Sequence, residues 1–299
     1  MQAYLDLARQ GKNDWWRYVL AVLLMLFTWQ ILGSLPGAAL LVWSMLRDGL
    51  PKVSGAAGLP GANTPVGFVA LMLASVFFLG GIYLAMRFIH RRRLRTLITP
   101  SPSIAWGRLF QGFGVWFVLS ALMSVLEALL YPGRYVWSLD LPRLLPFVFL
   151  ALVFIPIQIG TEELFFRGYL LQGLGLRSRN IWVLSALSGL VFGLPHLVNP
   201  EASVNYPLFG FYYFAFGFSL AYITLRDGRL ELALGAHAAN NLFSVIFANY
   251  TITVLPSPSL FTITVLDAVY SVPAALIGMV IFVSLFVGPW RRKTPTELA

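Results

Sequence analysis

The sequence contains no cysteine, which excludes disulfides, thiolate nucleophiles and cysteine-ligated metals. Charge is scarce as well, because Asp, Glu, Lys and Arg make up 11% of the 299 residues, against about a quarter in a typical soluble domain. Hydrophobic residues account for 58%, and the mean hydropathy is +0.77. This composition predicts an integral membrane protein. No repeat or low-complexity tract divides the chain, so residues 1–299 are expected to form one membrane domain.

Several familiar protease motifs are absent too. His196 and His237 are followed by Leu and Ala, so there is no H-E-x-x-H zinc motif, and no G-x-S-x-G nucleophile turn occurs. An aspartyl protease would need a pair of aspartates within the membrane. The aspartates instead fall in predicted tails, loops or span ends: Asp6, Asp14, Asp48, Asp140, Asp227 and Asp267.

Long apolar runs separated by Pro, Gly, Asn or charged residues predict an all-α, polytopic bundle. A span needs roughly 20 mostly apolar residues. The segment Thr251–Leu266 is apolar but contains Pro256 and Pro258, so we expect an outer loop there. Eight spans are predicted: Tyr18–Leu46, Val66–Phe88, Leu109–Leu130, Leu144–Gln172, Ile181–Leu197, Leu208–Leu225, Leu232–Tyr250 and Val269–Trp290.

The net charge of +9 could indicate nucleic acid, but the basic residues are scattered over helix ends, so we expect none as a partner. The run "HRRRLR", His90 to Arg95, is typical of a topology determinant near anionic lipid head groups. With a cytoplasmic N-terminus and eight alternating spans, seventeen of the 21 Lys and Arg residues lie inside. This asymmetry predicts that both termini are cytoplasmic. The four outside are Arg47, Lys52, Arg134 and Arg143.

Polar residues within the predicted spans are concentrated in three short stretches. Charged groups at membrane depth are costly and are candidate functional residues. Glu162 and Glu163 lie in "EELFFR" with Arg167, four residues after Glu163 and thus one helical turn away, in the favourable order for an ion pair. Glu162 lies about 100° around the helix and is free to point elsewhere.

The two histidines within spans each have a partner at helical spacing. Phe192 precedes His196 by four residues, and Asn241 follows His237 by four, so the members of each pair face one direction. Asn240 is expected to form interhelical hydrogen bonds.

Counting residues from the helix ends predicts that the first two stretches can meet. Glu162 is 17 residues before Arg179 and His196 is 17 after it, whereas His237 is only eight residues after Arg229. The three depths agree only if the end of the hairpin projects from the membrane or the fourth helix tilts. Pro156 within that helix favours a tilt or kink.

Two chemistries suit a Glu, two His and an Asn around a wet pocket. A carboxylate can take a proton from water, imidazole can share it, and a second His with an amide can donate hydrogen bonds to a developing oxyanion. Alternatively, Glu162, His196 and His237 form a three-ligand zinc site with an open position for water. Both routes lead to hydrolysis of an acyl bond.

The three stretches together resemble the CPBP family of intramembrane proteases, which includes the type II CAAX prenyl endopeptidases and bacteriocin-processing or immunity proteins. The E-E-x-x-x-R motif is matched by "EELFFR", F-x-x-x-H by "FGLPH", and H-x-x-x-N by "HAANN", in the family's order. The resemblance covers residues 144–250, which are therefore expected to be the catalytic core helices.

The resemblance implies an endopeptidase that cuts membrane-associated proteins or peptides at a site opening to the cytoplasm. It implies that Glu162 activates water with His196 as its partner, and that His237 and Asn241 line the oxyanion side. It also implies that Glu163 and Arg167 hold the first motif in shape. It does not decide between zinc and a metal-independent glutamate mechanism. Pro195, directly before His196, departs from the expected pattern and should bend that helix.

The alternative function is a non-enzymatic membrane protein, either a transporter or an immunity or scaffold protein that retains the fold. A transporter would show inverted repeats with matching broken helices, and none is visible in the sequence. The short chain, a start that does not resemble a cleaved signal peptide and the lack of cysteine favour a bacterial inner membrane.

Overall fold

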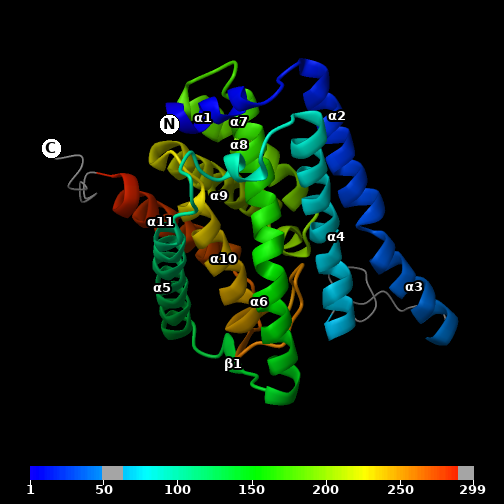
Figure 1. Cartoon of the computed structure of the whole chain (residues 1–299). Helices are drawn as coiled ribbons and strands as arrows, with labels where there is room; N and C mark the ends of the chain where they lie inside the picture. The colour runs from blue at the N-terminus through cyan, green and yellow to red at the C-terminus, as the bar shows by residue number, and fades with distance from the viewer. Residues whose placement is uncertain (49–62, 289–299) are drawn as a thin grey trace.

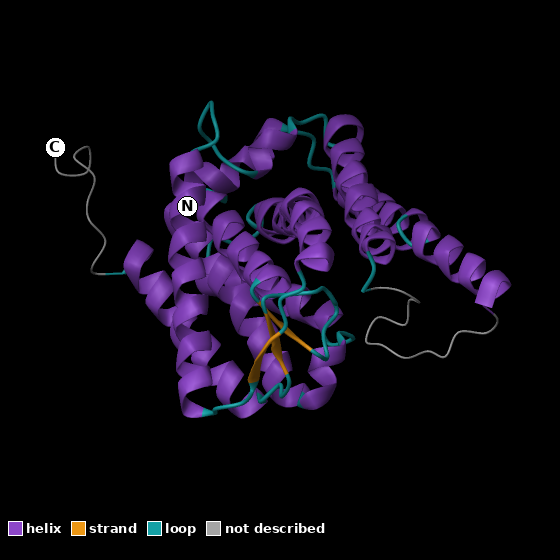
Figure 2. Ribbon diagram, turned by 90° about the horizontal axis from the view of Figure 1, so that it is seen from below, coloured by secondary structure: helices purple, strands orange, loops and turns teal. Residues whose placement is uncertain are grey.

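The computed structural model describes residues 1–48 and 63–288, and nearly all of its regular structure is helical (Figures 1 and 2). Six helical segments are long and apolar enough to cross a membrane, and they coincide with six of the predicted spans, which confirms an all-α polytopic bundle. The end of the predicted eighth span and the basic residues Lys52, Arg291, Arg292 and Lys293 lie outside the described residues. The six segments are Trp15–Arg47, Pro65–Ile89, Trp106–Leu130, Leu141–Leu174, Tyr206–Asp227 and Ala268–Val287.

Three of these segments are composite helices: a π-helical stretch joins two α-helices in Trp15–Arg47 and Leu141–Leu174, and ends the helix in Pro65–Ile89. The helix starts follow local chemistry: the side chains of Asp140, Asn180, Asn205 and Asp267 each accept a backbone N–H at the first turn. In chain order the elements of the six segments are α2 (Trp15–Leu26), η2 (Phe27–Leu32), α3 (Leu35–Asp48), α4 (Pro65–Leu84), η3 (Ala85–Ile89), α5 (Trp106–Leu130), α6 (Leu141–Glu163), η5 (Leu164–Leu170), α7 (Leu171–Leu174), α9 (Tyr206–Asp227) and α11 (Ala268–Val287).

The predicted fifth span has nearly its predicted bounds, whereas the seventh is shorter than expected. They correspond to α8 (Ile181–His196) and α10 (Glu231–Ile246), which have 16 residues each. Such helices extend for about 24 Å, less than the roughly 30 Å hydrocarbon core. Neither belongs to the six candidate spans, and α10 gives way to a short strand where the prediction continued the helix to Tyr250. Both helices carry candidate site residues: His196 closes α8, and His237 and Asn241 lie in α10.

Helix α10 forms the centre of the bundle. Residues 232–239 are all buried, and the helix packs against α5, α6 and α9. Glycines permit the close crossing with α5, because a Cβ on Gly112 would meet the backbone of Leu232 and one on Gly235 would meet the backbone of Leu109. A helix buried on all sides needs internal partners for its polar residues. His237, Asn240 and Asn241 find theirs on the surrounding helices.

One end of the bundle gathers four basic segments, which we call the arginine-rich end (Figure 1). It comprises residues 1–12, 90–99, 175–180 and 226–230. The backbone N–H of Lys12 donates to His90 O, Asp6 pairs with Arg179, and the N–H of Leu230 donates to Ile98 O. The short helices α1 (Gln2–Asp6), η1 (Leu7–Gln10) and η4 (Leu94–Leu97) lie here, and α1 packs against α7. The end of the α7–α8 hairpin, residues 175–180, also lies at this end.

The opposite end carries a small sheet, and we call it the sheet end (Figures 1 and 2). Its strand order is β1-β3-β2, with β1 antiparallel and β2 parallel to the central strand. The segment predicted as an outer loop therefore contains β3. Another short helix, η6, follows α8. These elements are β1 (Tyr135–Trp137), η6 (Pro200–Val204), β2 (Ala248–Tyr250) and β3 (Phe261–Ile263).

Candidate active site

The first motif lies where α6 passes into the π-helix η5. Glu162 and Glu163 close α6, and Arg167 lies in η5. Arg167 Nη1 donates to Glu163 Oε1 at 2.7 Å, and Nη2 donates to Gly217 O at 3.3 Å. Both side chains of the pair are fully buried, and the guanidinium lies 4.3 Å from the centre of the Phe192 ring. The predicted ion pair therefore forms, and it links α6 to α8 and α9.

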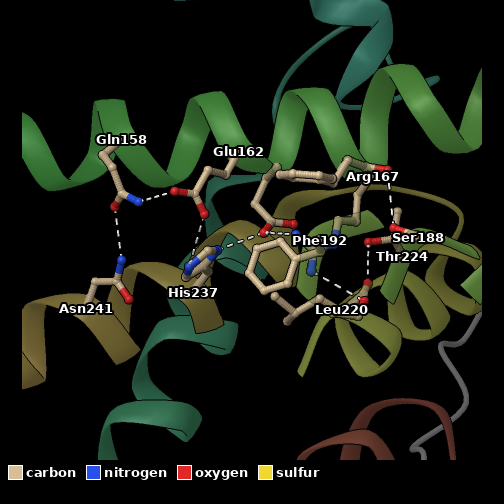
Figure 3. Close-up of polar contacts among 12 residues, drawn as sticks. Gln158, Glu162, Arg167, Ser188, Phe192, Leu220, Thr224, His237 and Asn241 are labelled. Carbon is tan, nitrogen blue, oxygen red and sulfur yellow. Dashed lines mark hydrogen bonds and ion pairs between the residues drawn. The ribbon is translucent and has the colours of Figure 1, made fainter. Parts of the chain in front are cut away.

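His237 joins this pair from α10. Its Nδ1 lies 2.8 Å from Glu163 Oε1. Because an ionised carboxylate only accepts hydrogen bonds, Nδ1 carries the proton and donates. In a neutral ring the lone pair is then on Nε2, which faces Glu162 Oε2 at 3.8 Å (Figure 3). The buried ion pair thus sets the tautomer of the histidine that faces the second glutamate.

His196 takes the same tautomer by a different route. Its Nδ1 donates to the backbone oxygen of Phe192 at 2.7 Å, and its Nε2 lies 4.0 Å from Glu162 Oε2. The Phe192 ring lies beside the imidazole, with 4.2 Å between centroids. Pro195 falls in the last turn of α8 and does not turn His196 away from Glu162. The structure therefore brings Glu162, His196 and His237 together.

A chain of side-chain hydrogen bonds holds the other oxygen of Glu162. Trp116 Nε1 donates to Asn240 Oδ1 at 3.2 Å, Asn240 Nδ2 to Asn241 Oδ1 at 3.0 Å, and Asn241 Nδ2 to Gln158 Oε1 at 2.9 Å. Gln158 Nε2 then donates to Glu162 Oε1 (Figure 3). We call these five side chains the amide chain. All donors point the same way, so each bond polarises the next toward the carboxylate.

The amide chain includes two residues that the sequence analysis missed. Gln158 lies four residues before Glu162 on α6, so its helical spacing was a usable signal. Trp116 on α5 gave no such signal. Asn240 links α10 to α5, as predicted for an interhelical hydrogen bond, while Asn241 donates to Gln158 with one of its two N–H groups.

A cavity of about 610 Å³ lies beside the cluster and is lined by Glu162, His196 and His237. Aromatic rings form much of its wall. The lining includes Tyr135 and Tyr250 from the sheet, but no residue of the four segments that define the arginine-rich end. The cavity therefore extends from Glu162 toward the sheet end.

The same three side chains were predicted as an alternative zinc site, and their donor atoms are of the types that zinc accepts. Their facing atoms are 3.8 Å and 4.0 Å apart. Within residues 1–48 and 63–288, no group of three or more His, Asp or Glu side chains is arranged to hold a metal ion. The zinc alternative stays a prediction, and the mechanism below uses side chains alone.

Comparisons with known proteins agree with the motif positions. Residues 142–243 match the family model described as type II CAAX prenyl endopeptidase Rce1-like, a range that contains all three motifs. The chain is 34% identical over 260 residues to the uncharacterized protein YyaK of Bacillus subtilis (strain 168), covering 85% of each chain. No solved structure gives a significant match.

Proposed function

The chain belongs to the CPBP family of CAAX-type intramembrane proteases, and on this basis we propose that it is an endopeptidase of membrane-associated proteins or peptides. The single observation that carries the proposal is the placement of Glu162 Oε2. It faces the Nε2 atoms of His196 and His237, is buried, and accepts no hydrogen bond from any residue that the structure describes. The carboxylate oxygen and the two unprotonated ring nitrogens are all hydrogen-bond acceptors. A water molecule between them can donate two hydrogen bonds.

The proposed reaction begins with that water molecule. Glu162 takes one proton from it through Oε2, while the unprotonated Nε2 of an imidazole accepts the hydrogen bond of the remaining O–H and holds it in place. The oxygen forms a bond to the carbonyl carbon of the peptide, whose oxygen becomes an oxyanion. The proton on Glu162 then passes to the amide nitrogen and the C–N bond breaks. The products are a free amine and a carboxyl group, so the water atoms are fully accounted for.

Asn241 is the proposed oxyanion donor. One of its N–H groups is held by Gln158, which leaves the second to donate to the oxyanion. His237 contributes to this side only when its Nε2 carries a proton. Glu163 and Arg167 act through His237 by fixing its ring and are therefore positioning residues.

The direction of the cavity supports access from the sheet end. The family resemblance implied an opening to the cytoplasm, but the lining residues run away from the arginine-rich end, which the charge asymmetry assigns to the cytoplasm. We therefore propose that substrate reaches Glu162 from the non-cytoplasmic half of the membrane.

Single cysteines test this direction, because the chain has none of its own. In intact bacterial cells, a membrane-impermeant maleimide should label Thr264→Cys at the sheet end and spare Ser103→Cys at the start of α5. It should also label Val198→Cys, at an exposed residue of the cavity lining. The reverse pattern would place the cavity on the cytoplasmic side and restore the expectation from the resemblance.

The enzymatic proposal is tested with purified protein and a panel of membrane-associated peptides. Glu162→Gln keeps an acceptor for Gln158 but removes the base, so cleavage should be lost. Asp140→Asn, an exposed acid outside the cavity, is the matched control and should cleave normally. Equal behaviour of wild type and Glu162→Gln in every assay would favour the non-enzymatic alternative. Cleavage that is lost on adding a chelator, by a protein that contains zinc, would instead support the metal route. Cleavage that a chelator does not change would support the glutamate route.

A further inference from the structure

The charges that line the cavity have one sign. Its described lining contains three carboxylates, Glu127, Glu162 and Glu201, and no Lys or Arg. A peptide that ends in this cavity would bring its C-terminal carboxylate among these groups. A buried charge without a counter-charge is costly, so the cavity is poorly suited to a free C-terminus.

Two of the three carboxylates already have partners. Arg134 Nη1 lies 3.2 Å from Glu127 Oε1, and the Tyr135 hydroxyl donates to Glu127 Oε2 at 2.9 Å. Glu162 faces the two imidazoles. This leaves Glu201 as the carboxylate of the lining that neither a cation nor the candidate site occupies.

Glu201 lies in η6, five residues after His196 in the chain. Its Oε2 accepts the backbone N–H of Val254 at 3.1 Å, and it forms no ion pair with any residue that the structure describes. Burial raises the pKa of Glu201 because it disfavours the charged form. A cation brought to this carboxylate would remove that penalty. The cation would also form a charge-assisted hydrogen bond with Glu201 in a cavity from which water is partly excluded.

We infer that the cavity binds a substrate segment carrying a positive charge, with Glu201 as the counter-charge. The charge can come from a Lys or Arg side chain or from a free amine. The inference deepens the proposed function and rests on it: the same site would cut chains next to a basic group, at a distance from a free C-terminus.

Matched peptides provide the test. The parent is neutral, acetylated at its N-terminus and amidated at its C-terminus. One derivative receives a lysine that is moved along the peptide, another a free N-terminal amine, and a third a free C-terminal carboxylate near the scissile bond. Wild type should show kcat/KM about tenfold higher for one of the cationic peptides, which is the scale of one hydrogen bond to a charged group. The position of the preferred charge distinguishes a side chain from a terminal amine.

The variant Glu201→Gln keeps an acceptor for the Val254 N–H but removes the charge. It should cleave the neutral peptide like wild type and lose the preference for the cationic one. Asp140→Asn should retain the preference, because it changes the net charge of the protein by the same amount but leaves Glu201 in place. Equal rates for all peptides, or a preference for the free carboxylate, would overturn the inference while leaving the proposed protease activity intact.

Binding measurements separate this inference from the proposed function. If no peptide is cleaved, the anisotropy of labelled peptides bound to Glu162→Gln still reports the charge preference. Tighter binding of the cationic peptide that is lost on adding Glu201→Gln would support the inference without any turnover. Equal binding of all peptides would overturn it.

Discussion

His237 Nδ1 lies 2.8 Å from Glu163 Oε1, the same oxygen that Arg167 contacts at 2.7 Å. One buried carboxylate oxygen therefore both neutralises a buried guanidinium and sets the tautomer of a histidine that faces Glu162. This relationship gives the two adjacent glutamates different tasks. Glu163 is fully buried in the ion pair with Arg167, whereas Glu162 is part of the cavity wall.

The two glutamates should therefore respond differently to the same substitution. Glu163→Gln leaves Arg167 buried without a counter-charge and should lower the free energy of unfolding by about 3–5 kcal/mol, with loss of activity. Glu162→Gln should abolish cleavage with little change in unfolding temperature. Thermal unfolding of both variants in one detergent, together with peptide cleavage, checks the contrast. A stable Glu163→Gln protein would show that the ion pair contributes little to the fold.

The amide chain predicts graded effects on catalysis. Gln158→Ala removes the donor to Glu162 Oε1 and should lower kcat by about tenfold with KM nearly unchanged, because the carboxylate is no longer held. Trp116→Phe keeps the buried ring but removes the far donor, so it should lower kcat only about two- to threefold. A double-mutant cycle between Gln158→Ala and Asn241→Ala should be non-additive. Additive losses would mean that the two side chains act independently.

The close crossing of α5 and α10 predicts opposite outcomes for two glycines of one helix. A Cβ on Gly112 would meet the backbone of Leu232, whereas nothing lies within 4 Å of a Cβ on Gly114. Gly112→Ala should therefore destabilise by about 1–3 kcal/mol through overpacking. Gly114→Ala should stabilise slightly, by about 0.5–1 kcal/mol, because alanine is the better helix former. Unfolding in detergent measures both, and equal stabilities would contradict the crossing.

His90 at the arginine-rich end predicts a pH dependence of stability. It is buried, with Nδ1 donating to Lys12 O at 2.8 Å, and burial lowers the pKa of His90 below its ordinary 6.5. The unfolded chain then binds this proton more readily than the folded protein, so His90 should reduce stability as the pH falls through 6.5. His90→Asn keeps a donor for Lys12 O and should lose less stability than wild type between neutral and mildly acidic pH. Identical pH profiles of the two unfolding temperatures would rule out this contribution.

Some of the site could be predicted from residue spacing. The Glu163–Arg167 pair and the shared faces of Phe192 with His196 follow from helical geometry, since residues four apart lie on one side of a helix. Counting residues to the helix ends predicted that Glu162 can meet His196, whereas the count for His237 disagreed. Gln158 could have been found by the same spacing rule. Trp116 could not, because nothing local in α5 indicates which side chain of α10 it meets.

One failure concerns the length of a helix. The span predicted at α8 ended one residue beyond the observed helix, whereas the span predicted at α10 continued to Tyr250 although the helix ends at Ile246 and gives way to β2 of the small sheet. Hydropathy does not record where a helix gives way to a strand. The sheet pairs strands that are up to 128 residues apart in the chain, such as Tyr135 with Ile263, and such pairing leaves no local trace.

The sequence by itself determined that this protein is a helical membrane bundle and which stretches carry its intramembrane polar residues. Hydrophobic length and helical spacing are local properties, and the cost of charge in lipid makes Glu162, Glu163 and Arg167 conspicuous. Only the tertiary structure decided which oxygen of each glutamate meets which nitrogen, and that the cavity runs from Glu162 to the sheet end. Those features depend on how α5, α6, α8 and α10 pack against one another. Packing brings together residues that are far apart in the chain, and no spacing pattern in the sequence marks such contacts.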